Sequence, residues 1–167
     1  EIMEELKKEL SKEGHKPYII PEGASNGIGT FGYFQAMEEI IKQEREMNLR
    51  FDAIVIAVGS GGTYGGLFLA NKIMKHDCKI YGVNVCDDEE HFKVQIEKVI
   101  REAQTYIDSN LDIKRDEIKI IDGYVGRGYA LSQPEELEFI YDIAKLEGVI
   151  LDPVYTGKAM YGLVKEI

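Results

Sequence analysis

Short apolar runs alternate along the chain with longer segments in which apolar residues recur at helical spacing. Residues 53–58, Ala-Ile-Val-Ile-Ala-Val, contain no polar side chain, which is typical of a strand that a parallel sheet covers on both faces. Two further strands are predicted at residues 79–85 and 117–121, and a short extended piece at residues 149–151. Helices are predicted over residues 32–49, 64–76, 89–110 and 134–147. The alternation predicts an α/β domain of three layers, helix–sheet–helix, with a mostly parallel sheet.

The 167 residues are enough for one domain with its own hydrophobic core, and they contain no internal repeat. Both ends fall inside helical patterns. Residues 1–14 form a charged helix, and residues 159–167 end without a cap, a glycine or a proline. We therefore expect residues 1–167 to be a single domain that is incomplete at both ends, a fragment of a larger protein.

Composition and charge narrow the class of protein. Hydrophobic residues make up 44% and charged residues 30%, as in an ordinary globular domain, and the net charge is −10. An acidic chain argues against nucleic-acid partners and against a basic contact with a membrane surface. Apolar runs are too short to cross a bilayer, and no signal peptide opens the chain. The two cysteines, Cys78 and Cys86, predict buried thiols of a cytoplasmic protein.

A glycine-rich loop, Gly59-Ser60-Gly61-Gly62-Thr63, follows the most apolar strand and precedes a helix. Glycines let the backbone approach a ligand closely, and the first N–H groups of a helix attract an anion. Two hydroxyl groups add donors to the same place. The loop therefore predicts a phosphate site, although a tight turn between strand and helix would use the same residues.

Missing residues narrow the kind of phosphate. The loop lacks the Gly-Lys-Ser/Thr of a nucleotide-binding P-loop, and Tyr64 stands where a dinucleotide fingerprint needs glycine. One compact phosphate group suits five residues better. The glycine-rich segment 21–30 is also expected at the carboxyl end of the sheet, where Ser25 and Asn26 either line the cavity or form a turn. No spacing of His, Cys or Asp predicts a metal site.

Ser60-Gly-Gly-Thr63 after an apolar strand resembles the phosphate loop of the tryptophan-synthase-β-like, fold type II enzymes that use pyridoxal 5'-phosphate. Residues 21–33, 122–129 and 147–160 are similar to signatures of one group in that family, the D-cysteine desulfhydrases and 1-aminocyclopropane-1-carboxylate deaminases. The resemblance covers essentially the whole chain. It implies the larger cofactor-binding domain of such an enzyme, with residues 1–16 as the helix that connects it to a smaller domain.

The resemblance also implies site residues. Gly59, Ser60, Gly61, Gly62 and Thr63 would bind the cofactor phosphate. Tyr129 and Tyr155 match two tyrosines that flank the cofactor, where a phenol can orient the substrate or move a proton; the alternative is that each is a half-buried aromatic whose hydroxyl satisfies a loop carbonyl.

Thr156 stands where the deaminases are expected to carry a glutamate that reaches the pyridine nitrogen of the cofactor. A neutral hydroxyl there leaves a weaker electron sink, which suffices to eliminate a thiolate but not to open a cyclopropane ring. The threonine therefore favours desulfhydrase over deaminase.

Lys158 is a tempting candidate for the lysine that bonds to the cofactor. The resemblance instead assigns that lysine to a position before residue 1, which leaves Lys158 structural or solvated. His15, His76 and His91 are expected to be solvated. Without the bonding lysine, the 167 residues alone are predicted to be inactive and to bind the cofactor weakly, through its phosphate.

For the intact enzyme the resemblance implies a homodimeric lyase that converts D-cysteine to pyruvate, hydrogen sulfide and ammonia. Two alternatives stay open: a deaminase or related sulfo-lyase of the same group, and a non-catalytic module that binds phosphate or a nucleotide. The expected partners are a small amino-acid substrate and the remaining parts of the same enzyme.

Overall fold

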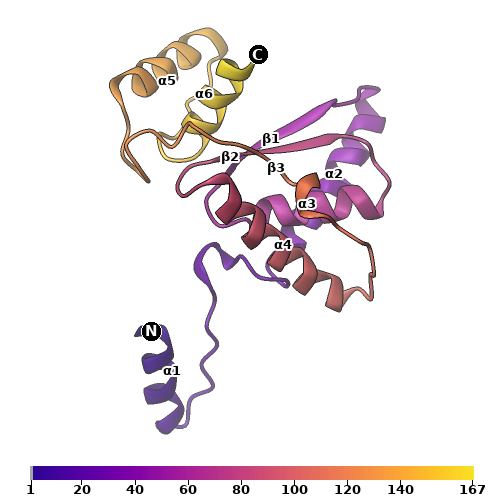
Figure 1. Ribbon diagram of the computed structural model, residues 1–167, viewed down its shortest axis with the longest axis vertical. Coiled ribbons are helices and arrows are strands. Elements are labelled where there is room, and N and C mark those ends of the chain that lie inside the picture. The colour runs from indigo at the N-terminus through magenta and orange to yellow at the C-terminus, as the bar shows by residue number, and fades with distance from the viewer. Residues whose placement is uncertain (1) are drawn as a thin grey trace.

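The computed structural model describes residues 2–167 (Figure 1). Three strands form one sheet: β1 (Ala53–Val58), β2 (Lys79–Asn84) and β3 (Lys119–Ile121). The helices are α1 (Ile2–Lys12), α2 (Phe31–Met47), α3 (Gly62–Ile73), α4 (Glu89–Tyr106), α5 (Pro134–Glu147) and α6 (Thr156–Glu166). Two short 3-10 turns, Glu22–Ala24 and Arg115–Glu117, lie between them.

The sheet is parallel throughout, in the order β1-β2-β3. Helices α3 and α4 pack on one face with α2 against α3, and α6 packs on the other face with α5 beside it (Figure 1). The predicted three-layer α/β architecture is therefore confirmed. Parallel strands put their carboxyl ends on one edge, so the loops after β1, β2 and β3 meet there.

Tyr64, which is fully buried, joins the helical layer to the sheet. Its hydroxyl donates to the carbonyl of Ile80 at 3.0 Å and accepts from the N–H of Lys119 at 2.8 Å, so one phenol connects β2 with the start of β3. Gly82 makes room for it, because a Cβ there would lie 3.1 Å from the tyrosine ring and 2.5 Å from Val58. Burial raises the pKa of Tyr64 to about 12, so its hydroxyl keeps its proton and remains a donor.

The most apolar strand is not the most buried one. β1 is only half-buried along most of its length, whereas β2 carries buried residues at four of its six positions. Within residues 2–167, β1 pairs with β2 alone and stands at an edge of the sheet. Helices α3 and α6 contact β1 from opposite faces, as predicted, but its edge position leaves the strand only half-buried, because apolar composition does not reveal a strand's place in the sheet order.

Helix and strand ends differ from their predicted positions for local reasons. Helix α3 begins two residues earlier than predicted, directly after Gly61. Helix α4 stops at Tyr106, since Asp108 adopts a positive φ of 48° that turns the chain away. Residues 149–151, predicted to be extended, form no strand.

His76, predicted to be solvated, is largely buried: its side chain is 12% exposed. Its Nε2 lies 2.8 Å from Glu44 Oε2, and its Nδ1 accepts from the N–H of Cys78 at 3.3 Å. The pKa of the Glu44 carboxyl is lowered by the hydrogen bond that it accepts from the N–H of Phe51, and His76 lowers it further. Burial acts in the opposite direction but is outweighed. The histidine thus joins the end of α2 to the start of β2.

Helix α1 lies apart from the three layers and buries none of its residues (Figure 1). One side of it is apolar, with Ile2, Met3, Leu6 and Leu10 all exposed. No helix among residues 2–167 is long and apolar enough to span a membrane.

Candidate functional site

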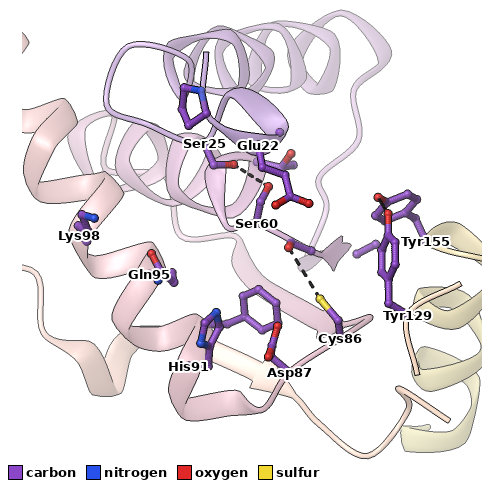
Figure 2. Close-up of a pocket in the computed structure, with 16 residues that line it drawn as sticks. Glu22, Ser25, Ser60, Cys86, Asp87, His91, Gln95, Lys98, Tyr129 and Tyr155 are labelled. Atoms are coloured by element: carbon purple, nitrogen blue, oxygen red, sulfur yellow. Dashed lines mark hydrogen bonds between the residues drawn. The ribbon is translucent and has the colours of Figure 1, made fainter. Parts of the chain in front are cut away.

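A cavity of about 640 Å³ lies at the carboxyl ends of β1 and β2 (Figure 2). Its walls come from the segment before α2, the loop after β1, the turn after β2, one side of α4, and two tyrosines from the last third of the chain. Ligands bind at this edge of parallel sheets, and the volume is within the range of small-molecule sites. The cavity is therefore the candidate site.

The glycine loop forms one wall. Gly61 has a φ of 89°, and α3 starts at the next residue, so the first N–H groups of the helix have no partner within the helix. The N–H of Gly62 donates to Ser25 Oγ at 3.1 Å, and Ser25 Oγ lies 2.6 Å from Ser60 Oγ (Figure 2). Ser25 therefore lies at the helix N-terminus, as one of the two interpretations predicts, whereas Asn26 accepts from the N–H of Gly29 in a turn.

Neighbouring side chains explain why the loop needs glycine. A Cβ at Gly59 would lie 3.1 Å from Tyr155 Cε1, and one at Gly61 would lie 3.0 Å from Ile96 Cγ1. A Cβ at Gly62 would meet Ser25 Oγ at 2.6 Å. Gly59, Ser60 and Thr63 line the cavity, whereas the sides of Gly61 and Gly62 on which a Cβ would stand face Ile96 and Ser25.

The residues present fit a phosphate group. The hydroxyls of Ser60 and Thr63 line the cavity beside a helix N-terminus, whose partial positive charge favours an anion. Lys98, across the cavity on α4, adds a positive charge to the wall. A helix N-terminus with hydroxyl donors suits one phosphate group.

Tyr129 and Tyr155 form the wall beside Gly59 (Figure 2). Their hydroxyl groups are hydrogen-bonded to each other, and the ring centroids are 5.9 Å apart with an angle of 71° between the planes. The hydrogen bond with Tyr129, together with burial, raises the pKa of Tyr155 to about 12. At neutral pH Tyr155 therefore holds its proton and can donate it.

Asp152 fixes the backbone that carries Tyr155. Its carboxylate accepts from the N–H groups of Val154, Tyr155 and Thr156 at 2.7 to 2.9 Å, and from Thr156 Oγ1 at 2.5 Å. Burial raises the pKa of Asp152, but these hydrogen bonds outweigh it and lower that pKa to about 2. Asp152 is thus an anchor for the start of α6.

Thr156 is exposed and does not line the cavity. Its hydroxyl donates to Asp152 and accepts from the N–H of Asp152 at 2.9 Å. Its assignment to the ring nitrogen of a cofactor remains a prediction.

Sequence reasoning missed one wall of the cavity. His91, Gln95 and Lys98 lie at positions i, i+4 and i+7 of α4 and face the glycine loop across the cavity (Figure 2). That spacing marks one side of a helix and could have identified them as a group. Glu22 and Cys86 complete the wall, and Cys86 Sγ lies 3.8 Å from the carbonyl of Gly59.

Lys158 is 1% exposed, so the prediction that it is solvated is excluded and the structural alternative holds. Its Nζ donates to two backbone carbonyls. No group of three or more His, Cys, Asp or Glu side chains among residues 2–167 is arranged to hold a metal ion.

Fold and site together describe a phosphate-cofactor domain of the α/β type. Residues 1–167 match the family described as pyridoxal-phosphate dependent enzyme over their whole length, and the chain belongs to that family. The predicted family and its cofactor class are therefore confirmed.

The chain is also similar to individual members. It is 44% identical over 164 residues to the Arabidopsis thaliana mitochondrial bifunctional D-cysteine desulfhydrase/1-aminocyclopropane-1-carboxylate deaminase; these residues are 97% of this chain and 39% of the relative. A crystal structure of an ACC deaminase homologue matches with a TM-score of 0.87 and 39% identity, over 97% of this chain and 48% of that one. The T.th. threonine deaminase shares the fold, with a TM-score of 0.53 at 18% identity. The chain spans about half the length of these proteins or less.

Proposed function

We propose that the protein containing this chain is a pyridoxal-phosphate lyase that eliminates hydrogen sulfide from D-cysteine. The observation that carries the proposal is the pair of phenols at the cavity, beside the glycine loop and a helix N-terminus suited to phosphate, with the neutral Thr156 directly after one of them. The similarity to a relative that is named for both reactions supports D-cysteine and 1-aminocyclopropane-1-carboxylate as the substrates to compare.

Each wall of the cavity has a role in this proposal. Ser60, Thr63 and the first N–H groups of α3 hold the phosphate of the cofactor. Pyridoxal phosphate, when bound, supplies an electron sink for the substrate carbon that bears the amino group. Tyr155, which keeps its proton at neutral pH, would donate a hydrogen bond to the substrate carboxylate or to the departing sulfur. Tyr129 holds that hydroxyl in place.

Thr156 separates desulfhydrase from deaminase. Turnover of the full natural protein would be measured with D-cysteine, L-cysteine and 1-aminocyclopropane-1-carboxylate. We expect sulfide and pyruvate from D-cysteine and little product from the cyclopropane acid. Thr156→Glu is expected to change the cofactor absorbance and slow sulfide release, because a carboxylate would alter the charge at the ring nitrogen. An unchanged spectrum and an unchanged rate would contradict the role given to Thr156.

We further propose that the 167 residues alone hold the cofactor only through its phosphate. Lys158 cannot serve as the bonding lysine, because its Nζ is buried and already donates to two carbonyls. Borohydride reduction of the chain with pyridoxal phosphate, followed by peptide mass analysis, should leave Lys158 unmodified. A stoichiometric adduct on Lys158 would refute this.

Helix α1 is expected to pack against another part of the same protein. Its apolar side has nothing to pack against among residues 2–167, and the relatives contain about twice as much chain. A homodimer is proposed from the resemblance alone and is tested by the mass of the full protein in solution.

A further inference from the structure

Lys158 is a buried cation that the proposed reaction does not use. It lies in the first turn of α6, three residues after Tyr155, and is 1% exposed. Within residues 2–167, its Nζ forms no ion pair with a carboxylate. It donates instead to the carbonyls of Val125 at 2.5 Å and Gly128 at 2.8 Å. A buried ammonium group is costly unless such bonds satisfy it, so its place calls for a functional explanation.

Both carbonyls belong to the loop that carries Tyr129. Gly126 and Gly128 adopt positive φ values of 65° and 132°, and this backbone path turns the two carbonyls toward one point. Tyr129 follows Gly128 directly. The lysine therefore fixes the backbone immediately before one of the two phenols.

The other end of Lys158 is equally fixed. Asp152 anchors the backbone of Tyr155 and Thr156, and the N–H of Gly157 donates to the carbonyl of Asp152 at 2.8 Å. A Cβ at Gly157 would lie 2.6 Å from that carbonyl. The helix turn that carries Tyr155 and Lys158 is thus one rigid unit.

We propose that Lys158 is a positioning residue, which ties the loop before Tyr129 to the helix after Tyr155 and so holds the two phenols in hydrogen-bond contact at the cavity. The proposal rests on the proposed function only in the effect that it predicts on the turnover of D-cysteine. The effect on the phenols themselves follows from the contacts alone.

The arrangement suits lysine because an ammonium group has three donors and can serve two carbonyls on a curved loop at once. The charge of Lys158 also acts on Cys86, which lines the cavity. Burial and Asp87 raise the pKa of the Cys86 thiol, and Lys158 lowers it. Tyr129, Cys86 and Glu22 are the titratable groups that act on Tyr155, and they come from three separate segments.

The test compares Lys158→Met, which keeps length and loses the donors, with Lys158→Arg, which keeps donors, in the full natural protein with its cofactor. Lys165→Met, on the exposed side of the same helix, is the matched control. The pKa of Tyr155 would be followed by NMR of tyrosine labelled at Cζ, with signals assigned from Tyr129→Phe and Tyr155→Phe.

In Lys158→Met we expect the pKa of Tyr155 to fall from about 12 toward its ordinary value of 10, as in Tyr129→Phe, because the phenols separate. In Lys158→Arg the pKa of Tyr155 should stay nearer to 12 than to 10, and in Lys165→Met it should stay at about 12. The kcat for D-cysteine should fall about 10- to 100-fold with a smaller change in KM, since misplacement of a reacting group has effects of this order.

A double-mutant cycle separates positioning from general destabilisation. If Lys158 acts through Tyr129, the variant with both Tyr129→Phe and Lys158→Met should turn over about as slowly as Tyr129→Phe alone. The proposal would be overturned if the losses of turnover in the two single variants added up in the double variant. It would also be overturned if the pKa of Tyr155 stayed at about 12 in folded Lys158→Met. Failure of D-cysteine turnover in the unsubstituted protein would instead refute the proposed function and leave the pKa test in force.

A measurement without variants covers the case in which Lys158→Met does not fold. In protein labelled with ¹⁵N-lysine and ¹³C carbonyls, the Nζ of Lys158 should exchange its protons slowly and show couplings across hydrogen bonds to Val125 and Gly128. Exchange as fast as that of Lys165, with no such coupling, would overturn the proposal.

Discussion

The glycine loop and the tyrosine pair face the same cavity but are built in different ways. The loop is five consecutive residues between β1 and α3, and its position follows from two elements that the core packs in place. Tyr129 and Tyr155 are 26 residues apart, are partly exposed, and depend on polar anchors at Lys158 and Asp152. The difference indicates that local backbone conformation positions the glycine loop, whereas a few long-range hydrogen bonds position the two tyrosines that would act on the substrate.

The largest effect is expected at Gly61. Gly61→Ala should lower the free energy of unfolding by about 2–4 kcal/mol, because alanine is strained at positive φ and its Cβ would press on Ile96. Urea denaturation measures the change. The control is Gly32→Ala in α2, where a Cβ meets nothing within 4 Å, and which should be neutral or stabilising by up to ~1 kcal/mol. If the two variants were equally stable, the claim that the loop requires glycine at position 61 would be wrong.

A smaller effect is expected on the tyrosine side. Asp152→Asn should cost about 1 kcal/mol, the usual value of a side chain that caps a helix N-terminus. Because the folded pKa of Asp152 is lowered, its contribution is complete above the carboxyl's ordinary pKa of 3.8 and is lost as the pH falls toward 2. The gap between the variant and the unsubstituted protein should therefore close over that range in acid denaturation. The control Asp142→Asn, on the surface of α5, should change stability by less than ~0.5 kcal/mol at any pH.

The smallest effect on stability is expected from Tyr129→Phe. Both rings are partly exposed, so the free energy of unfolding should change by less than about 0.5 kcal/mol. The pKa of Tyr155 should nevertheless fall from about 12 toward 10, because its hydrogen bond with Tyr129 is the main cause of the rise. Absorbance titration of the phenolate measures this, with Tyr141→Phe as an exposed control. A Tyr155 that still titrates near 12 would mean that burial, and not the pair, sets its pKa.

The comparison also explains what the sequence could predict. Residues 53–58 and 134–147 form β1 and α5 with the predicted bounds, because apolar composition and a proline at a helix start are local signals. The glycine loop was predictable for the same reason. The wall of α4 was missed, since His91, Gln95 and Lys98 look like an ordinary solvated side until the loops around them are placed.

Long-range contacts escaped prediction most completely. The burial of Lys158 depends on two carbonyls about 30 residues away, and that of His76 on Glu44, 32 residues before it. The edge position of β1 depends on sheet order, to which an apolar strand gives no clue. These features follow from tertiary structure, so residue type and spacing alone cannot supply them.

The glycine loop is proposed to hold the phosphate of the cofactor, and the proposed function depends on this contact. The direct measurement is a titration of the ¹⁵N-labelled protein with 4'-deoxypyridoxine 5'-phosphate, which has the ring and phosphate of the cofactor but no aldehyde to react with lysines. We expect saturable shifts of the amide signals of Gly61, Gly62 and Thr63, which are absent when the ligand lacks its phosphate. Saturable binding that leaves these three amides unmoved would contradict it.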